Sequence, residues 1–219
     1  MCSAASRSRE GEPLELDLHY TDPRLVDLYD LENTWGPDND FWLELAGGLG
    51  ARTIIDLGCG TGLLTRALAV DDRHVIGVDP SPAMLAVARK GQGAGRVRWI
   101  QGDASALDAL RTEPGFVPAD LALMTGNVAQ VFLEDEPWEA TLRSLHAALR
   151  PGGRLAFDSR NPSSRNPSAR EWVRWTREAT YQRLEDTPHG PVETWLEVVL
   201  VERDRVRLQG HNVFLPPAR

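Results

Sequence analysis

Runs of apolar residues with the length of strands alternate with apolar residues at helical spacing along most of the chain. The strand-like runs are residues 53–56, 74–79, 97–101, 120–125 and 154–158. Between them apolar residues recur every three or four positions, as in residues 63–68, 82–89 and 138–149. Because strands buried on both faces read as continuous apolar runs, this alternation predicts a parallel sheet covered by helices on both faces and joined by right-handed crossovers.

The pattern changes at both ends of this α/β stretch. Residues 1–13 are polar and rich in Ser, Arg, Gly and Pro, which predicts a disordered lead-in. Residues 14–50 are predicted to hold two helices that form an N-terminal cap. The α/β core is expected to span residues 51–160, and residues 161–219 a loop followed by an antiparallel appendage. There, apolar and polar residues alternate with a period of two from Val192, which predicts a hairpin that turns at residues 203–205 and ends at Phe214. We expect this hairpin to lie at the C-terminal side of the sheet, over its last strand or over the mouth of the ligand site.

Five arginines stand among Pro, Ser and Asn in residues 160–177: Arg160, Arg165, Arg170, Arg174 and Arg177. Two interpretations are open, a solvated loop and an anion-binding patch, and the polar composition favours the loop.

The core is organised around residues 53–64, TIIDLGCGTGLL, in which an apolar strand ends on Asp56 and three glycines follow at alternate positions. Strand, glycine turn and helix together bring backbone N–H groups and a helix N-terminus close to a ligand. Glycine is required there because a Cβ would collide with the ligand or forbid a positive φ. A tight turn that binds nothing is the alternative. Cys59 and Thr61 occupy the positions between the glycines.

Charge and cysteine content narrow the possible partners and the compartment. The chain has 219 residues, with 42% hydrophobic and 26% charged residues and a formal net charge of −8, which argues against a phosphate-backbone partner. The two cysteines form no disulfide framework, the five histidines show no ligand spacing, and we therefore expect a reducing cytoplasm and no metal. No run of about eighteen apolar residues is present, and no secretory signal is recognisable, so we expect no membrane partner.

Two nucleotide-type ligands use such a glycine turn, the dinucleotides and S-adenosylmethionine. A dinucleotide site needs a small residue five positions after the first glycine, where Leu63 stands here. Asp79 ends the second strand, roughly twenty residues after that glycine, where a carboxylate can accept both ribose hydroxyls of either ligand. Its removal is expected to lower cofactor affinity about ten-fold or more while changing the melting temperature of the unliganded protein little.

The stretch DLGCGTG (residues 56–62) resembles the first motif of the class I, Rossmann-like S-adenosylmethionine-dependent methyltransferases. The resemblance continues through VIGVDPSPAML, GDA and LRPGGRLAFD and includes the upstream YDLENTWGPDNDF, so it covers roughly residues 18–160. It implies a three-layer α/β fold with strand order 3-2-1-4-5, S-adenosyl-L-methionine as cofactor and methyl transfer to a small molecule. Members of this family that methylate amino groups of nucleic acids carry the tetrapeptide Asn/Asp-Pro-Pro-aromatic after strand four. This sequence has TGNV, residues 125–128, at that place, which argues against a nucleic-acid acceptor.

The resemblance also implies where the cofactor binds. The expected cofactor-binding residues are Asp56, Gly58, Cys59, Gly60, Thr61 and Gly62 for the methionine part, Asp79 for the ribose, Pro80, Ser81, Met84, Asp103 and Ala104 for the adenine, and Thr125, Gly126 and Asn127 beside the sulfur. On the substrate side we expect residues that follow strands four and five, where an open α/β sheet presents its ligands: Asn127, Gln130, Asp158 and Arg160. For Asp158, a purely structural role in capping the next turn is an equally good interpretation. The N-terminal aromatic residues Tyr20, Tyr29, Trp35 and Trp42 are read as core residues rather than as part of a cofactor site.

Two rivals remain to the methyltransferase interpretation. One is a nicotinamide-dependent oxidoreductase, which Leu63 disfavours. The other is a protein that binds S-adenosylmethionine with little or no turnover. The methyl acceptor and the oligomeric state are not encoded in any motif of the sequence.

Overall fold

The computed structural model describes residues 16–161, 164–202 and 206–216. The predicted lead-in at residues 1–13 and the predicted hairpin turn at residues 203–205 lie outside these described residues. Among the helices that the structure describes, none is long and apolar enough to cross a membrane.

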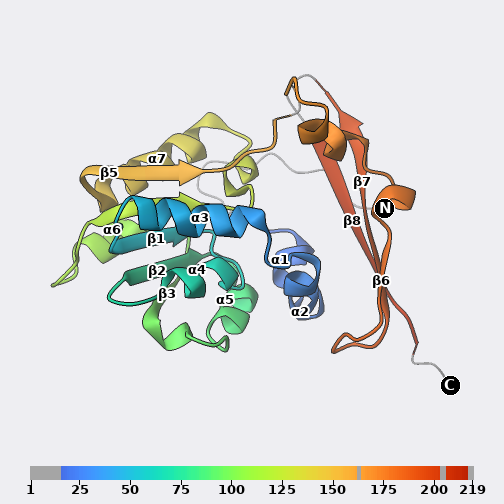
Figure 1. The fold of residues 1–219 in the computed structure, drawn as a ribbon, viewed down its shortest axis with the longest axis horizontal. Coiled ribbons are helices and arrows are strands. Elements are labelled where there is room, and N and C mark those ends of the chain that lie inside the picture. Colours follow the sequence, from blue (N-terminus) through green and yellow to red (C-terminus); the bar gives the residue numbers. More distant parts are fainter. Residues whose placement is uncertain (1–15, 162–163, 203–205, 217–219) are drawn as a thin grey trace.

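A five-stranded parallel sheet forms the centre of the protein, in the predicted order β3-β2-β1-β4-β5 (Figure 1). Its strands are β1 (Thr53–Leu57), β2 (His74–Asp79), β3 (Val97–Gln101), β4 (Ala119–Met124) and β5 (Leu149–Phe157). The predicted strand positions and the order 3-2-1-4-5 are therefore confirmed. Strand β5 begins before the predicted start, because the chain enters the sheet at Leu149, directly after the preceding helix, and its register with β4 shifts between Ala119 and Leu121.

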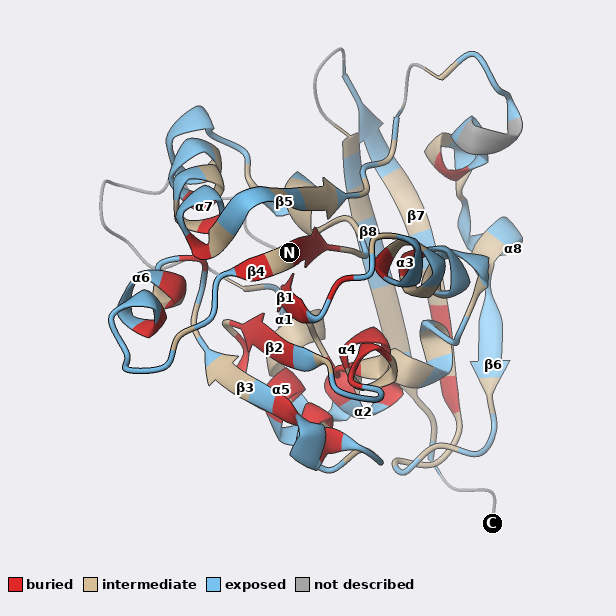
Figure 2. Ribbon diagram, turned by 60° about the vertical axis from the view of Figure 1, so that its left-hand side comes forward, coloured by how far each residue is buried: buried red, intermediate tan, exposed pale blue. Residues whose placement is uncertain are grey.

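Helices cover both faces of this sheet, and successive residues of each central strand face opposite sides. The helices between the strands are α4 (Leu63–Leu68), α5 (Pro82–Ala88), α6 (Ala106–Arg111) and α7 (Asp135–Ala148). Ile54 packs with residues of α3 (Pro37–Gly48) and α4, whereas the adjacent Ile55 packs with residues of α6 and α7. Figure 2 shows the resulting buried centre of the sheet. Burial on both faces explains why the strands read as unbroken apolar runs.

The N-caps of α5 and α7 follow from the residues at their first turns. Ser81 is the N-cap of α5, and its Oγ accepts the N–H of Met84 at 3.1 Å. Glu134 is the N-cap of α7, and Asp135 is the first helical residue, where its charge favours the N-terminus of the helix.

A second, antiparallel sheet stands beyond the carboxyl ends of the parallel strands, with α1 (Leu18–Thr21) and α2 (Pro23–Glu32) between the two (Figure 1). Its strands are β6 (Gln182–Leu184), β7 (Val192–Val201) and β8 (Val206–Phe214), and β7 pairs with both of the others. The Oγ1 of Thr194 in β7 donates to Glu32 of α2 at 2.6 Å. The hairpin prediction is thus confirmed, but no described strand pairs with the outer edge of β5, so the hairpin does not cover that edge.

The arginine-rich segment is more ordered than the solvated loop that its composition favoured. Part of it forms a 3-10 helix, η3 (Ser168–Arg174), followed by the short helix α8 (Arg177–Thr180). Trp172 of η3 is buried, and the carbonyl oxygen of Trp175 accepts the N–H of Val198 at 3.0 Å. The segment is therefore attached to the antiparallel sheet through apolar and backbone contacts that a reading of its charges does not reveal.

Candidate functional site

The glycine turn, residues 58–62, joins β1 to α4 at the carboxyl end of the central strand. Its three glycines have φ values of +76°, +54° and +75°, in the left-handed region that favours glycine. A Cβ on Gly58 would lie 2.4 Å from Val128, and one on Gly62 would lie 2.4 Å from Trp99. A Cβ on Gly60 would meet no atom within 4 Å. The outer two glycines therefore serve the packing of the protein, while the middle one leaves open space above the turn.

Asp79, at the end of β2, holds this turn in place. One carboxylate oxygen accepts the N–H of Gly60 and the other accepts the N–H of Ser81, both at 2.8 Å. The side chain is buried, and this burial raises the pKa of Asp79 even though both hydrogen bonds oppose the rise. Because Asp79 is the acceptor for two backbone donors, we expect its removal to destabilise the unliganded protein, in place of the small change in melting temperature expected from the sequence.

Asp56, at the end of β1, is buried at 1% exposure beneath the turn. Its Oδ2 accepts the Oγ1–H of Thr65 at 2.6 Å, and its Oδ1 has no hydrogen-bond partner among the described residues. Burial raises the pKa of Asp56 to about 6, although the bond from Thr65 lowers it. An unsatisfied buried carboxylate oxygen is costly unless a cationic or donor group completes it.

Cys59 lies within the glycine turn, near the carboxylates of Asp56 and Asp79. Burial raises the pKa of its thiol, and the negative charges of Asp56 and Asp79 raise it further. Because the thiolate is the nucleophilic form, this raised pKa disfavours a nucleophilic role for Cys59.

The residues expected around the adenine follow β2 and β3. Pro80 is half-buried, and Met84 is almost fully buried in the packing of α5. Asp103 is exposed, with Oδ1 accepting the N–H and the Oγ–H of Ser105 at 2.9 and 2.6 Å. Ala104 lies in the apolar core beside α6. Of these four, Asp103 offers the most accessible polar group at this edge of the sheet.

Two oxygens of Asp158 position the loop that follows β4. They accept the N–H groups of Gly126 at 3.0 Å and Asn127 at 2.5 Å. Asn127 has a φ of +67°, which is uncommon for a residue other than glycine, and the hydrogen bonds to Asp158 help to maintain it. Asp158 thus fixes the loop after β4. This structural role differs from the predicted cap of the next turn, because the N–H groups that it accepts lie in an earlier loop. Thr125, at the start of this loop, is half-buried.

Gln130 and Arg160 are brought together by a reciprocal pair of hydrogen bonds. The Oε1 of Gln130 accepts the N–H of Arg160 at 3.2 Å, and its Nε2 donates to the carbonyl oxygen of Arg160 at 3.3 Å. The Gln130 amide is therefore occupied by backbone, whereas the guanidinium group of Arg160 extends beyond this contact.

The N-terminal helices close over the glycine turn through two contacts that sequence reasoning missed. The Oγ1 of Thr61 donates to Asp30 of α2, and the Oγ of Ser81 donates to the carbonyl oxygen of Tyr20 in α1, each at 2.5 Å. These partners are 31 and 61 residues apart in the chain, and no local spacing signals the pairing.

Tyr20 and Tyr29 lie where these helices meet the turn. Burial raises the pKa of both phenols, the charge of Asp79 adds to the rise, and the charge of Arg160 opposes it. Both hydroxyls are thus within electrostatic reach of the two charged side chains at the ends of β2 and β5. The core interpretation of the N-terminal aromatic residues is right for Trp42, which is 5% exposed, and wrong for Trp35, which is 40% exposed and donates to Asp40.

These features fit an adenosine cofactor that carries an ammonium group. The open space at Gly60, the spare lone pairs of Asp79 and the unpaired oxygen of Asp56 converge at the carboxyl ends of β1 and β2, where open α/β sheets bind nucleotides. Within the described ranges, no three His, Cys, Asp or Glu side chains gather in a way that would hold a metal ion.

Comparison with known proteins agrees with this geometry. A family model described as a methyltransferase domain matches residues 54–153. The ubiquinone biosynthesis O-methyltransferase of Pseudomonas paraeruginosa is 30% identical over 148 residues, which cover 64% of this chain and 60% of that protein. The cypemycin N-terminal methyltransferase of a Streptomyces species is 30% identical over 145 residues, covering 65% of this chain and 57% of that protein. The chain thus spans about three-fifths of the length of these relatives.

Solved structures extend the likeness to nearly the whole chain. The sugar N-methyltransferase KedS8 from a Streptoalloteichus species superposes with a TM-score of 0.59 at 18% identity, over 99% of this chain and 85% of that one. At this level of identity the comparison shows a shared fold, the antiparallel sheet included.

Proposed function

The chain belongs to the class I, Rossmann-like S-adenosylmethionine-dependent methyltransferases, and from this premise we propose that it binds S-adenosyl-L-methionine and transfers the methyl group to a small-molecule acceptor. One observation carries the proposal. Asp79 holds the glycine turn by the N–H of Gly60, and the space over that residue is the only part of the turn where an added Cβ meets nothing. A ligand that approaches the turn therefore has room at Gly60, whereas Val128 and Trp99 cover Gly58 and Gly62.

In this proposal the cofactor residues are those expected from the sequence, with the roles that the geometry supports. Asp79 accepts the ribose hydroxyls with the lone pairs not used by Gly60 and Ser81, and Asp56 faces the ammonium group with its unpaired oxygen. The loop of Thr125, Gly126 and Asn127, held by Asp158, lies beside the reacting centre.

When bound, the cofactor supplies a methyl group already activated by a sulfonium. The protein therefore has to align the acceptor and exclude water, and a dedicated base is required only for a protonated amine or a hydroxyl. The phenols of Tyr20 and Tyr29, kept neutral by burial and by Asp79, can accept or donate a hydrogen bond to such an acceptor.

We propose a small acceptor because the relatives' names point in that direction and the charge argues against polynucleotides. The relatives include an enzyme of ubiquinone biosynthesis, and similar folds include a sugar N-methyltransferase. A net charge of −8 opposes binding to a phosphate backbone. We further propose a cytoplasmic protein without a membrane partner, in which residues 51–160 bind the cofactor and residues 161–219 face the acceptor.

The test is a thermal-shift and calorimetric comparison of S-adenosylmethionine, S-adenosylhomocysteine and NAD⁺. We expect the two sulfur-containing nucleotides to raise the melting temperature and NAD⁺ to have no effect; the reverse would favour the oxidoreductase. Release of S-adenosylhomocysteine against a panel of small hydroxyl and amine acceptors then separates an enzyme from a protein that only binds the cofactor. Binding without release for any acceptor would support the second alternative.

A further inference from the structure

Arg160 lies at an aromatic site outside the glycine turn. It follows the carboxyl end of β5, and its Cζ is 5.8 Å from the ring centroid of Trp172 and 5.8 Å from that of Trp175. The backbone of Arg160 is fixed independently by the two bonds to Gln130. The guanidinium group is therefore positioned by contacts on both sides.

Two donors at this site have no acceptor. Among the described residues, the guanidinium group of Arg160 has neither a hydrogen bond nor an ion pair, unlike Arg98 and Arg150, which bind carboxylates at 2.6 Å. The indole N–H of Trp172, a residue only 9% exposed, also has no partner. Buried donors are almost always satisfied in native proteins, so the unsatisfied indole N–H of Trp172 beside the half-buried guanidinium group of Arg160 indicates a missing acceptor group.

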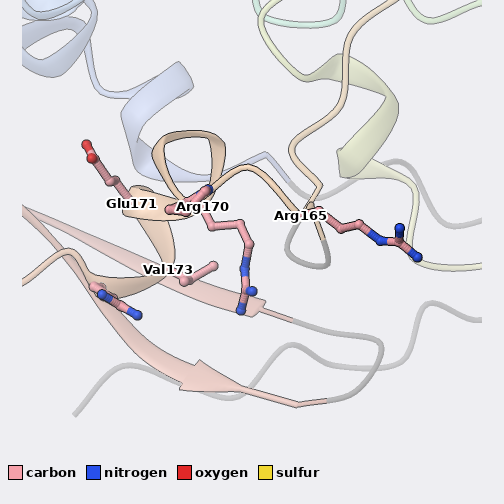
Figure 3. A pocket seen from close by; sticks show the side chains of 6 residues that line it. Arg165, Arg170, Glu171 and Val173 are labelled. Atoms are coloured by element: carbon pink, nitrogen blue, oxygen red, sulfur yellow. The ribbon is translucent and has the colours of Figure 1, made fainter.

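The segment that carries this site is rich in arginine. A cavity of about 240 Å³, which Arg160, Trp172 and Trp175 do not line, opens on η3 and its approach; its lining includes Arg165, Arg170 and Arg174 and a single acidic residue, Glu171 (Figure 3). Residues 160–177 carry five arginines and one glutamate in a protein with a net charge of −8. Such a local excess of one sign concentrates small anions at the cavity.

We propose that Arg160, Trp172 and Trp175 bind an anionic group, a phosphate or a carboxylate, of the methyl acceptor. The identification of the anion as part of the methyl acceptor rests on the proposed function, whereas the anion site itself rests on the geometry of these three residues. Gln130 connects Arg160 to the β4 loop, so an acceptor held by its charge at Arg160 would present its other end to Thr125–Asn127.

The binding experiment uses the protein without cofactor and follows tryptophan fluorescence and calorimetric heat on titration with inorganic phosphate, pyrophosphate and citrate. We expect saturable binding that Arg160→Gln weakens at least ten-fold and that Trp172→Phe, which keeps an aromatic ring but removes the indole N–H and part of the ring system, weakens several-fold. The matched control is Arg143→Gln, which also removes one positive charge, at an arginine of α7 that pairs with Glu139 at 3.4 Å. This variant should bind the anion within two-fold of the wild type. The preference between phosphate and citrate distinguishes the two sources of negative charge.

Three results would overturn the proposal. One is equal anion affinity in Arg160→Gln and Arg143→Gln. Another is loss of binding in Arg174→Gln but not in Arg160→Gln, which would place the anion in the cavity alone. The third is tight, salt-sensitive binding to duplex DNA that weakens with every arginine removed, which would indicate a polynucleotide arm.

Failure of this proposal and failure of the proposed function give different results. S-adenosylmethionine binding is measured separately on the same variants, and Arg160→Gln should leave it within two-fold because the backbone contacts to Gln130 remain. Anion binding without cofactor binding would refute the methyltransferase function and leave the Arg160 site intact. Cofactor binding without any anion binding would do the opposite.

Discussion

Replacing Asp79 by Ala should weaken both the fold and the cofactor site, for different reasons. The substitution leaves the N–H groups of Gly60 and Ser81 without their acceptors, each of which now lies at 2.8 Å. A hydrogen bond to a charged group contributes about 1.5–3 kcal/mol, and the burial that raises the pKa of Asp79 offsets part of the sum. We expect the free energy of unfolding of the unliganded protein to fall by roughly 2–4 kcal/mol.

For a chain of this length, that loss corresponds to a decrease in melting temperature of roughly 5–12 °C. Affinity for S-adenosylmethionine should fall by about ten-fold or more, because the ribose hydroxyls lose a charged acceptor. Calorimetric unfolding of the unliganded protein and isothermal titration with the cofactor measure the two effects separately. Asp79→Asn, which keeps the volume and one acceptor oxygen, should lose about half as much stability.

The control is Asp103→Ala, which removes an exposed carboxylate at the same edge of the sheet whose bonds go to Ser105 alone. Its effect on stability should stay within about 0.5 kcal/mol. An unchanged melting temperature in Asp79→Ala would refute the argument that this side chain holds the glycine turn. A lowered melting temperature with unchanged cofactor affinity would refute its role in binding.

Five further variants have distinct expected outcomes. Asp56 has a folded-state pKa of about 6, above its value in an unfolded chain. Its protonated side chain therefore contributes to stability fully below about pH 4, and this contribution is lost as the pH rises through 6. In denaturant titrations at pH 4 and pH 8, Asp56→Asn should reduce the difference in free energy of unfolding between the two pH values by about 3 kcal/mol. Gly60→Ala should reduce cofactor affinity and lower the free energy of unfolding by about 1–2 kcal/mol. Gly62→Ala should lower the free energy of unfolding further, because its Cβ would lie 2.4 Å from Trp99. Equal losses of stability in the two variants would contradict the open space at Gly60. Asp158→Ala should lower kcat more than cofactor affinity, since it frees the Gly126–Asn127 loop, and a change confined to affinity would contradict this role. Deletion of residues 180–219 should leave cofactor affinity within a few-fold and abolish turnover; loss of binding in a truncated protein that is still folded by circular dichroism would refute the proposed division of the chain.

The alternation of strand-like and helix-like segments determined the parallel sheet, its crossovers and the position of the glycine turn. These features are local, because side-chain period and glycine placement report backbone conformation directly. The family resemblance then supplied the order 3-2-1-4-5, which the structure confirms. Helix α6 and the short helix α1 carry too few periodic residues to be recognised in this way.

Tertiary structure alone decided what the side chains of the site do. Asp79 and Asp158 are both carboxylates at strand ends, and only the folded chain shows that each accepts two backbone N–H groups. In the same way, Thr61 meets Asp30 and Arg160 meets Trp172 through contacts between segments whose spacing in the chain has no periodicity. The physical reason is that local patterns encode backbone conformation and burial, whereas hydrogen-bond partners are selected by the packing of distant elements, which exists only after the sheet, the helical cap and the antiparallel strands have come together.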